Sequence, residues 1–590
     1  MNVNQKIHAL RNLMQENDLQ AYIVPTADPH QSEYVPSCWM DREWLTGFTG
    51  SAGLAIITND EAALWTDSRY FIQAEEELKS SEFKLHKQIK RYQPEHLIWL
   101  IDQLSEGDRI GLNGYNFTKT QVDQIKKYAD QKNIALVQQD LLSEIWLDRP
   151  EKSKAQVMQH EITYAGQSRS EKMGAIHKEL GKINADYYLI TALDEIAWTC
   201  NLRGSDVDFN PVFIAYLLLG KDQSFLYTDR DKFTPDLINS LQEDKISIKP
   251  YDQIQDDLNK LDASSQIALD KSIVSNVLYD SIKGSITEVT SIVHDLKGVK
   301  NRVELKNWED AMVSDGLALT HAFYWLEQTL LERPVSEAEF AAKIAQCRSE
   351  QNHYMGESFP AIVGYEGNGA IIHYHADKEN CAMIKNQGVL LCDSGGQYLN
   401  GTTDITRTVA FSEPSKQLKD HYTLVLKGMI GLTQAIFPKG TTGGQLDLLA
   451  RQHLWAQGLD FPHGTGHGVG FFMNVHEGPQ GFAPISTSRG KKVLVEGMVT
   501  TNEPGYYIQD QYGIRIENLL VVVPSKHKGF LKFDTMTLFP IDQTLIDETV
   551  ITSKEKAWFN NYHFKVLNLL SPHLEGDLLA WLKRKCKPLN

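Results

Sequence analysis

The stretch VLLCDSGGQYLNGTTDITRT, residues 389 to 408, joins two strand-like apolar runs and carries two aspartates. Asp393 ends the first run and Asp404 lies inside the second, with GG and NG turn signals between them. A hairpin of this kind would bring the two carboxylates side by side. Because adjacent like charges on a sheet cost free energy unless a cation lies between them, the stretch predicts a metal ion. Two exposed aspartates near a turn are the alternative.

A second pair of acidic residues lies further along the chain. Glu503 follows the strand-like run GMVTTN, and Glu517 lies in GIRIEN. The two-residue period of a strand puts Arg515 and Glu517 on one face, opposite Ile514 and Ile516. The apolar LLVVV that follows indicates a central strand, where an unpaired glutamate is rarely left. Arg515 is therefore expected to orient a carboxylate ligand. A surface position is the alternative for each glutamate.

Histidines are concentrated in FPHGTGHGVGFFMNVHEGP, residues 461 to 479, which places His463, His467 and His476 among five glycines. Four carboxylates with one imidazole form an oxygen-rich set, which suits Mn²⁺ or Co²⁺, with Zn²⁺ as an alternative. One catalytic ion with an open position does not need so many carboxylates. The set therefore favours two ions roughly 3.5 to 4 Å apart that share bridging carboxylates and a hydroxide.

The order of patterns along the chain predicts three domains. An amphipathic helix, an apolar strand, a tryptophan and a GS pair occur around AYIVPTAD and WLTGFTGS, and again around DYYLITALD and WTCNLRGS. This repeated pattern suggests a duplicated α/β domain. Chance similarity between two helix-strand units is the alternative. The polar stretch DRPEKSKAQ at 148–156 indicates a linker, and a long helical pattern begins near 298. The expected domains are 1–155, 156–297 and 298–590, with a C-terminal extension over about 525–590.

Composition points to an ordinary globular protein of the cytoplasm. The formal net charge of −17 argues against a surface for nucleic acid or for an anionic membrane. Near the N-terminus the apolar residues recur at helical spacing and do not form the continuous apolar stretch of a signal peptide. No apolar run approaches the roughly 18 residues that a membrane span requires. The six cysteines form no CxxC pair, which suits reduced thiols. We therefore expect no nucleic acid and no membrane as partners.

The chain carries, in this order, the motifs DSGGQYLNGTTDITRT, HGTGHGVG, NVHEGP, EPGYY and GIRIEN. Together they resemble the pita-bread metallopeptidases, a family that includes aminopeptidase P, prolidase and methionine aminopeptidase. Within it the chain is most similar to the three-domain cytosolic aminopeptidases P, and the resemblance extends through GFTGSAGLAIIT, LWTDSRYF, GAIIHY and WFNNYH. It implies a multidomain α/β and α+β fold, with two creatinase-like N-terminal α/β domains followed by a pita-bread catalytic domain.

The resemblance also implies which residues bind metal. The five implied ligands, which match the family pattern at every position, are Asp393, Asp404, His467, Glu503 and Glu517. In that scheme Asp393 binds one ion, and His467 with Glu503 binds the other. Asp404 and Glu517 bridge the two divalent ions. Mn²⁺ is the expected metal, with Co²⁺ or Zn²⁺ as alternatives.

Further residues are implied to act on the substrate. Three histidines match non-ligand active-site positions, namely His373, His463 and His476. His373 and His476 would bind the oxyanion of the peptide, and His463 would orient the substrate or relay a proton. Glu503 would carry the proton from the attacking water to the leaving proline nitrogen. Arg69 would reach the peptide from the N-terminal domain, although an arginine after a strand is more often a surface residue.

The implied activity is a metalloaminopeptidase that removes the N-terminal residue from peptides with proline in second position, using a metal-bridging hydroxide. A prolidase, which cleaves only Xaa-Pro dipeptides, shares the five ligands but usually has a single N-terminal domain. Non-catalytic pita-bread scaffolds that bind peptides or proteins, and the metal-free creatinase, usually have altered ligands. The family commonly forms homodimers. We expect the dimer surface on the C-terminal extension, because that segment adds aromatic helices with no catalytic part.

Overall fold

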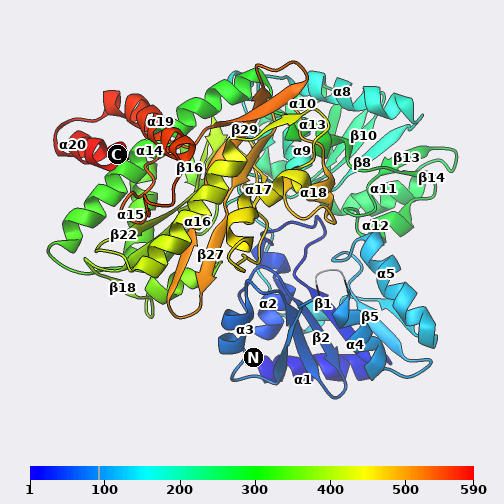
Figure 1. Cartoon of the computed structure of the whole chain (residues 1–590). Coiled ribbons are helices and arrows are strands. Elements are labelled where there is room, and N and C mark those ends of the chain that lie inside the picture. Colours follow the sequence, from blue (N-terminus) through cyan, green and yellow to red (C-terminus); the bar gives the residue numbers. More distant parts are fainter. Residues whose placement is uncertain (91–92, 590) are drawn as a thin grey trace. The chain divides into compact units, whose positions relative to one another are not determined.

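The computed structural model describes residues 1–90 and 93–589 and divides into two compact units (Figure 1). The first comprises Met1–Gln159, Gln167–Asp208 and Val212–Val293. The second comprises His160–Gly166, Phe209–Pro211 and His294–Asn590. Among the helices of the described residues, none combines the length and the apolar character that crossing a bilayer requires.

The first unit contains two six-stranded sheets of the same topology. The first sheet, in the order β4-β3-β2-β1-β5-β6, consists of β1 (Ala21–Pro25), β2 (Leu54–Thr58), β3 (Ala62–Thr66), β4 (Phe83–Lys87), β5 (Arg109–Leu112) and β6 (Ala135–Gln138). The second, in the order β12-β11-β10-β8-β13-β14, consists of β8 (Tyr187–Ile190), β10 (Tyr216–Gly220), β11 (Ser224–Tyr227), β12 (Ile246–Lys249), β13 (Gln266–Leu269) and β14 (Ser285–Glu288). Equivalent neighbours run in the same relative direction in both sheets. The repeat expected from the sequence is therefore present in the strand order.

Equivalent helices precede the two sheets. The helix α1 (Val3–Glu16) starts at a capping box on Asn2 and buries the helically spaced Ile7, Leu10 and Met14, as its sequence predicts. The helix α8 (Arg169–Lys182) starts at a capping box on Ser168. Other helices of this unit include α2 (Asp41–Thr46), α3 (Phe71–Glu77), α4 (Glu95–Gln103), α5 (Lys119–Ala129), α6 (Leu142–Ile145), α9 (Leu193–Cys200), α10 (Pro235–Glu243), α11 (Ile254–Lys260) and α12 (Asn276–Ser281).

The second unit holds the strands that carry the predicted metal ligands. A three-stranded sheet has the order β17-β19-β22, with β17 (Ile362–Tyr365), β19 (Val389–Ser394) and β22 (Ile405–Ala410). A six-stranded sheet has the order β23-β30-β29-β26-β24-β25, with β23 (Ile436–Pro438), β24 (Gly466–Gly468), β25 (Glu477–Phe482), β26 (Val499–Asn502), β29 (Asn518–Pro524) and β30 (Phe530–Thr535). The strands β27 (Gly505–Ile508) and β28 (Tyr512–Arg515) form a separate hairpin.

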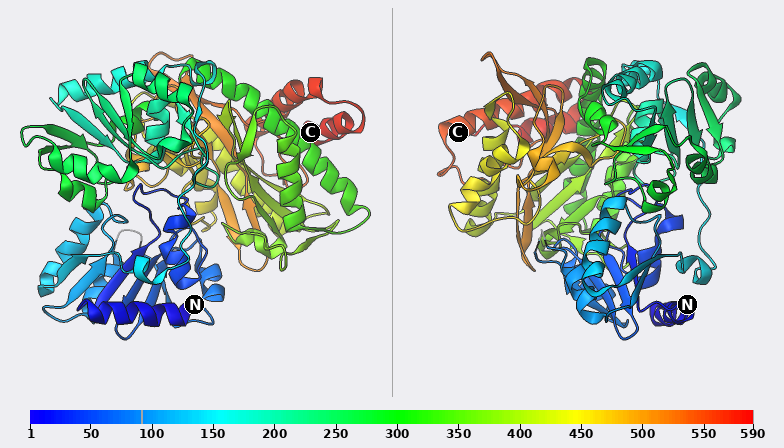
Figure 2. Two further views of the ribbon diagram at one scale, coloured as in Figure 1. Left: turned by 180° about the vertical axis from the view of Figure 1, so that it is seen from behind. Right: turned by 90° about the vertical axis from the view of Figure 1, so that its right-hand side faces the viewer.

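Long helices accompany these sheets (Figure 2). They are α14 (Arg302–Leu330), α15 (Glu337–Ser349), α16 (Lys416–Thr433) and α17 (Gly443–Trp455). The pair α14 and α15 and the pair α16 and α17 pack against each other. Most of their buried apolar side chains belong to a core shared with the strands, while Leu432, Leu446 and Ala450 belong to a second cluster.

Two acidic residues lie beside strands rather than inside them, which corrects the sequence prediction. Asp404 was expected within a strand, but the chain from Gly396 to Thr402 folds into a small hairpin, β20 (Gly396–Tyr398) and β21 (Gly401–Thr402). Asp404 therefore lies just before β22. Glu517 lies in the break between β28 and β29. It still lies on the same side as Arg515, because both side chains contact the hydroxyl of Thr406.

The segment after Ser525 is part of the core of the second unit. Its strand β30 is an interior strand of the six-stranded sheet. The helices α19 (Ser553–Leu570) and α20 (Gly576–Lys585) bury Phe559 and Trp581 in the same cluster as Trp308 of α14. These two aromatic side chains therefore fill the core of the second unit. The position of a dimer surface stays a prediction.

Arg407 on β22 links this C-terminal segment to the rest of the core. Its buried guanidinium donates hydrogen bonds to the carbonyls of Phe539 (2.8 Å) and Pro540 (3.0 Å) and to the hydroxyl of Tyr562 (2.8 Å). It also donates to the backbone carbonyl of Glu517. Acceptors from two distant parts of the chain are therefore satisfied by one cation.

We expect Arg407→Met to destabilise the second unit by about 3 kcal/mol or more, because several buried acceptors would lose their donor at once. Chemical denaturation of the metal-free protein, followed through the transition of this unit, measures the loss. Arg584→Met is the matched control, since Arg584 is exposed and only 4.0 Å from its acidic neighbour Glu327. Equal denaturation midpoints for the two variants would contradict the role of Arg407.

Candidate metal centre

Three of the five predicted ligands meet in a buried cluster. One ligand atom each from Asp404, His467 and Glu517 lies within 4.8 Å of the others. The Nε2 atom of His467 is 3.4 Å from a carboxylate oxygen of Asp404 and 3.7 Å from one of Glu503. Carboxylate and imidazole groups are common ligands of divalent first-row metals, and their spacing here would let them bind the same ion.

The imidazole of His467 is oriented for metal binding by its backbone contacts. Its Nδ1 lies 2.9 Å from the carbonyl oxygen of Gly468, which can only accept, so Nδ1 carries the proton. The Nε2 lone pair therefore points toward Asp404. The hydroxyl of Thr501 accepts a hydrogen bond of 3.0 Å from the backbone N–H of His467 and fixes β24 beside β26. This is the usual arrangement of a histidine ligand.

Asp393 is joined to the cluster through Arg515. The guanidinium of Arg515 donates to Oδ2 of Asp393 (2.7 Å) and to the hydroxyl of Thr406 (3.1 Å). Thr406 in turn donates to Glu517 (2.7 Å). The other oxygen of Asp393, Oδ1, is buried and has no hydrogen-bond partner among the described residues. A buried carboxylate oxygen of this kind needs a cation or a donor, so the residues fit a metal.

Burial and mutual repulsion change the acidity of the cluster. Burial, followed by repulsion from neighbouring carboxylates, raises the pKa of Asp404 and of Glu517 well above their usual values. Burial likewise raises the pKa of Glu503 to about 7, although Arg515 opposes this effect. Without a cation, the cluster therefore binds protons at neutral pH.

His463 belongs to a second hydrogen-bonded chain that starts at Arg515. The guanidinium donates to the hydroxyl of Tyr507 (2.8 Å), and that hydroxyl lies 2.8 Å from Nε2 of His463. Nδ1 of His463 is 2.7 Å from the carbonyl of Gly464 and must donate, so the Tyr507 hydroxyl donates to Nε2. Burial and the Arg515 charge lower the pKa of His463 well below its ordinary value, which keeps the ring neutral.

Tyr507 was not singled out from the sequence, although it lies in the motif EPGYY. The hairpin pairing puts Gly505 opposite Arg515, so Tyr507 and Arg515 share a face. A Cβ atom at Gly505 would lie 2.5 Å from the Tyr507 hydroxyl, so glycine leaves the room that this contact needs. The two-residue period of EPGYY was the available signal.

His476 and His373 lie close to this cluster. The ring of His476 is 4.3 Å from that of His467, centroid to centroid, at 89°. Its neighbour Glu477 is buried and paired with Lys297 (2.9 Å) and Lys300. The carbonyl of Ile372, next to His373, accepts a hydrogen bond of 3.5 Å from Arg515.

Arg69 lies in the first unit, between β3 and α3. Its guanidinium donates two hydrogen bonds to Asp67, of 2.9 and 2.8 Å. The predicted contact with a peptide stays a prediction.

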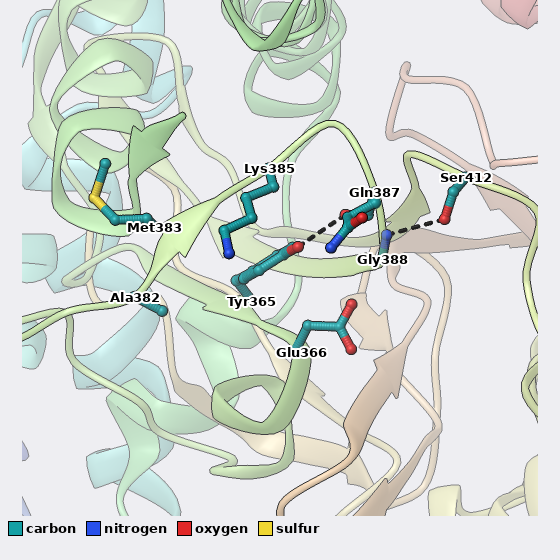
Figure 3. A pocket seen from close by; sticks show the side chains of 8 residues that line it. All are labelled: Tyr365, Glu366, Ala382, Met383, Lys385, Gln387, Gly388 and Ser412. Atoms are coloured by element: carbon teal, nitrogen blue, oxygen red, sulfur yellow. Dashed lines mark hydrogen bonds between the residues drawn. The ribbon is translucent and has the colours of Figure 1, made fainter. Parts of the chain in front are cut away.

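A separate cavity of about 620 Å³ opens beside β17 and the strand β18 (Met383–Ile384) (Figure 3). Its lining residues are Tyr365, Glu366, Ala382, Met383, Lys385, Gln387, Gly388 and Ser412. Tyr365 donates to the carbonyl of Gln387 (2.9 Å), and the N–H of Gly388 donates to Ser412 (3.0 Å). None of the predicted site residues lines this cavity, so it is distinct from the metal centre.

Residues 307–524 match the model of metallopeptidase family M24. The chain is 39% identical over 607 residues to a probable Xaa-Pro aminopeptidase P of Laccaria bicolor, with 100% of this chain and 94% of the relative covered. The chain belongs to metallopeptidase family M24. Residues 6–144 and 148–304 each match the Creatinase/Prolidase N-terminal domain, and residues 529–589 match the C-terminal region of peptidase M24. The expected fold class, two creatinase-like domains followed by a pita-bread domain, is confirmed.

Other proteins match the chain over different lengths. A probable Xaa-Pro aminopeptidase P of Fusarium vanettenii is 41% identical, with 99% of both chains covered. The crystal structure of X-prolyl aminopeptidase from Caenorhabditis elegans, described as a cytosolic enzyme with a di-nuclear active site, superposes with a TM-score of 0.95 at 33% identity and full coverage of both chains. The prolidase from Pyrococcus horikoshii has a TM-score of 0.50 at 23% identity and covers 63% of this chain and 99% of its own.

We expect the metal-free M24 chain to lose stability as the pH rises through 7, by on the order of 1 kcal/mol between roughly pH 6 and 8. The folded pKa of Glu503, about 7, exceeds its ordinary value of 4.5. A carboxyl with a raised pKa holds its proton more tightly when folded. This advantage is present at low pH and is lost as the pH rises through the folded pKa.

Denaturation midpoints of chelator-treated protein across this range measure the effect. Glu503→Gln is the control, because it removes this titration and leaves those of the histidines. Saturating divalent metal should also reduce the slope. A wild-type midpoint that rises relative to that of Glu503→Gln over this range would contradict the assignment.

Proposed function

We propose that the chain is a Xaa-Pro aminopeptidase that releases the N-terminal residue from peptides with proline in second position. The observation that carries the proposal is similarity to proteins of that name over the full length of both chains. The buried cluster around His467 supports it, because this chain retains a carboxylate-rich set that can hold divalent ions. The proposed set of two ions is supported by the di-nuclear site named for the Caenorhabditis elegans enzyme. Mn²⁺ is proposed as the metal because the ligand set is rich in oxygen.

When bound, the two ions would acidify a water molecule and polarise the carbonyl of the first residue. The ions would be held by five side chains, those of Asp393, Asp404, His467, Glu503 and Glu517. Glu503 would carry a proton from the attacking water to the leaving proline nitrogen. His373 and His476 would donate hydrogen bonds to the oxyanion.

Neutral His463 would serve as an orienting group. Its Nδ1–H is engaged by Gly464 and its Nε2 by Tyr507, so its position is fixed relative to Arg515. We further propose a cytoplasmic homodimer, in line with the cytosolic origin stated for the Caenorhabditis elegans enzyme. Contact of Arg69 with the peptide also belongs to this proposal.

Hydrolysis of Arg-Pro-Pro compared with Gly-Pro tests the substrate class. The expected result is release of arginine from the tripeptide, abolished by a chelator and restored by Mn²⁺, with little cleavage of the dipeptide. Cleavage of Gly-Pro alone would identify a prolidase instead. Binding of Xaa-Pro peptides without cleavage in the presence of metal would support a non-catalytic scaffold.

His467→Ala should lose both metal and activity, because it removes the one imidazole ligand. His476→Ala should retain metal and lose roughly 10² to 10³ in kcat, the range for removing one oxyanion donor. Metal analysis after gel filtration and steady-state kinetics separate these effects. His527→Ala, at an exposed histidine of the same unit, should behave as wild type. Full metal occupancy in His467→Ala would refute the ligand assignment.

A further inference from the structure

His373 lies on a segment with little packing of its own. The segment follows the turn η5 (Glu366–Ala370) and leads to β18. Ile372 is buried, but the segment is largely exposed between His375 and Asn380, so apolar contacts hold little of it in place after His373. A side chain that must act at a defined point needs support from elsewhere, because an error of about 1 Å can cost on the order of 10² in rate.

That support comes from the buried carboxylate of Glu337, the first residue of α15. It accepts hydrogen bonds from the backbone N–H of Tyr365 (2.7 Å) and of Ala382 (2.8 Å), at the two ends of the segment. Figure 3 shows these two residues from the side of the neighbouring cavity. The N–H of Glu337 donates to the carbonyl of Ala382 (3.1 Å), which closes the base of the segment.

The same carboxylate also holds the segment from within. The hydroxyl of Tyr374, the residue after His373, donates to Oε2 of Glu337 (2.7 Å). The amide of Asn368 donates to both carboxylate oxygens and to the Tyr374 hydroxyl (3.0 to 3.1 Å). Burial and the adjacent carboxylate raise the pKa of Tyr374 above its ordinary value, so the phenol stays protonated.

On its other side, His373 follows a residue that is tied to the metal centre. The carbonyl of Ile372 accepts from Arg515, whose guanidinium also binds Asp393. The backbone of His373 is therefore fixed between two charged groups, Arg515 before it and Glu337 after it.

We propose that Glu337 and Tyr374 are positioning residues that hold His373 for catalysis, an inference that rests on the proposed function. The proposed arrangement is a buried, charge-assisted clamp, in which one carboxylate accepts hydrogen bonds from four donors between Tyr365 and Ala382. The clamp acts through His373 and contacts neither the metals nor the substrate.

Tyr374→Phe tests the clamp, because it removes only the hydroxyl. The expected result is a roughly tenfold lower kcat on Arg-Pro-Pro, with KM and metal content unchanged. Hydrogen exchange of residues 371–381 should become faster, while that of 389–410 stays the same. Tyr227→Phe is the matched control, since it deletes a phenol-to-carboxylate bond to Asp257 (3.0 Å) in the first unit. Glu337→Gln replaces one acceptor oxygen with an NH₂ group that faces other donors. It should therefore lower kcat more than Tyr374→Phe does.

A double-mutant cycle with His373→Ala distinguishes positioning from a general effect on folding. If the clamp acts through His373, adding Tyr374→Phe to His373→Ala should change kcat no further. Losses that multiply, or unchanged activity and exchange in Tyr374→Phe, would overturn the inference. If wild-type protein with Mn²⁺ does not cleave Arg-Pro-Pro, the proposed function fails, and hydrogen exchange alone then decides whether Tyr374 anchors the segment.

Discussion

The burial of several carboxylates in one place is the constraint on which the second unit depends. Asp404 and Glu517 are buried and Glu503 is largely so, and burial with repulsion from neighbouring carboxylates disfavours their charged forms. The hydroxyl of Thr406 donates to Glu517 and that of Thr501 to Glu503, which satisfies only part of the acceptor capacity of these carboxylates. The folded chain must therefore bind either protons or cations, and the buried free oxygen of Asp393 makes cations the better match.

The backbone reaches this arrangement by placing acidic residues where strand pairing stops. Asp404 precedes β22, Glu503 follows β26, and Glu517 lies between β28 and β29. Inside a strand, alternation fixes the face to which a side chain points. At a strand end that restriction is relaxed, so residues from two sheets and a hairpin can converge on one point. Arg407, which donates to the carbonyl of Glu517, ties this point to the C-terminal part of the core.

Short-range patterns in the sequence predicted much of this arrangement. Features that depend on long-range contacts could not be predicted in this way. Apolar runs and turn signals located the strands around Asp393 and Glu503, and the echo of two helix-strand units anticipated two sheets of one topology. The ends of the strands at Asp404 and Glu517 were misplaced. The small hairpin pairs with Tyr354–Glu357, and the break separates a strand that pairs with β27 from one that pairs with β26. Tyr507 was missed because its role is visible only beside Arg515.

The non-ligand histidines show most clearly what a sequence pattern cannot reveal. Each depends on a different buried charge: His463 contacts Tyr507 beside Arg515, His476 precedes Glu477 between two lysines, and His373 precedes a tyrosine bound to Glu337. An imidazole near neutral pH is useful only in a defined tautomer and position. A histidine keeps one tautomer and position only if its hydrogen-bond partners are themselves held in place. Buried ion pairs, and carboxylates whose oxygens all accept hydrogen bonds, are rigid in this sense. The charges around the centre therefore do two jobs, since some can hold metal and others hold the histidines beside it.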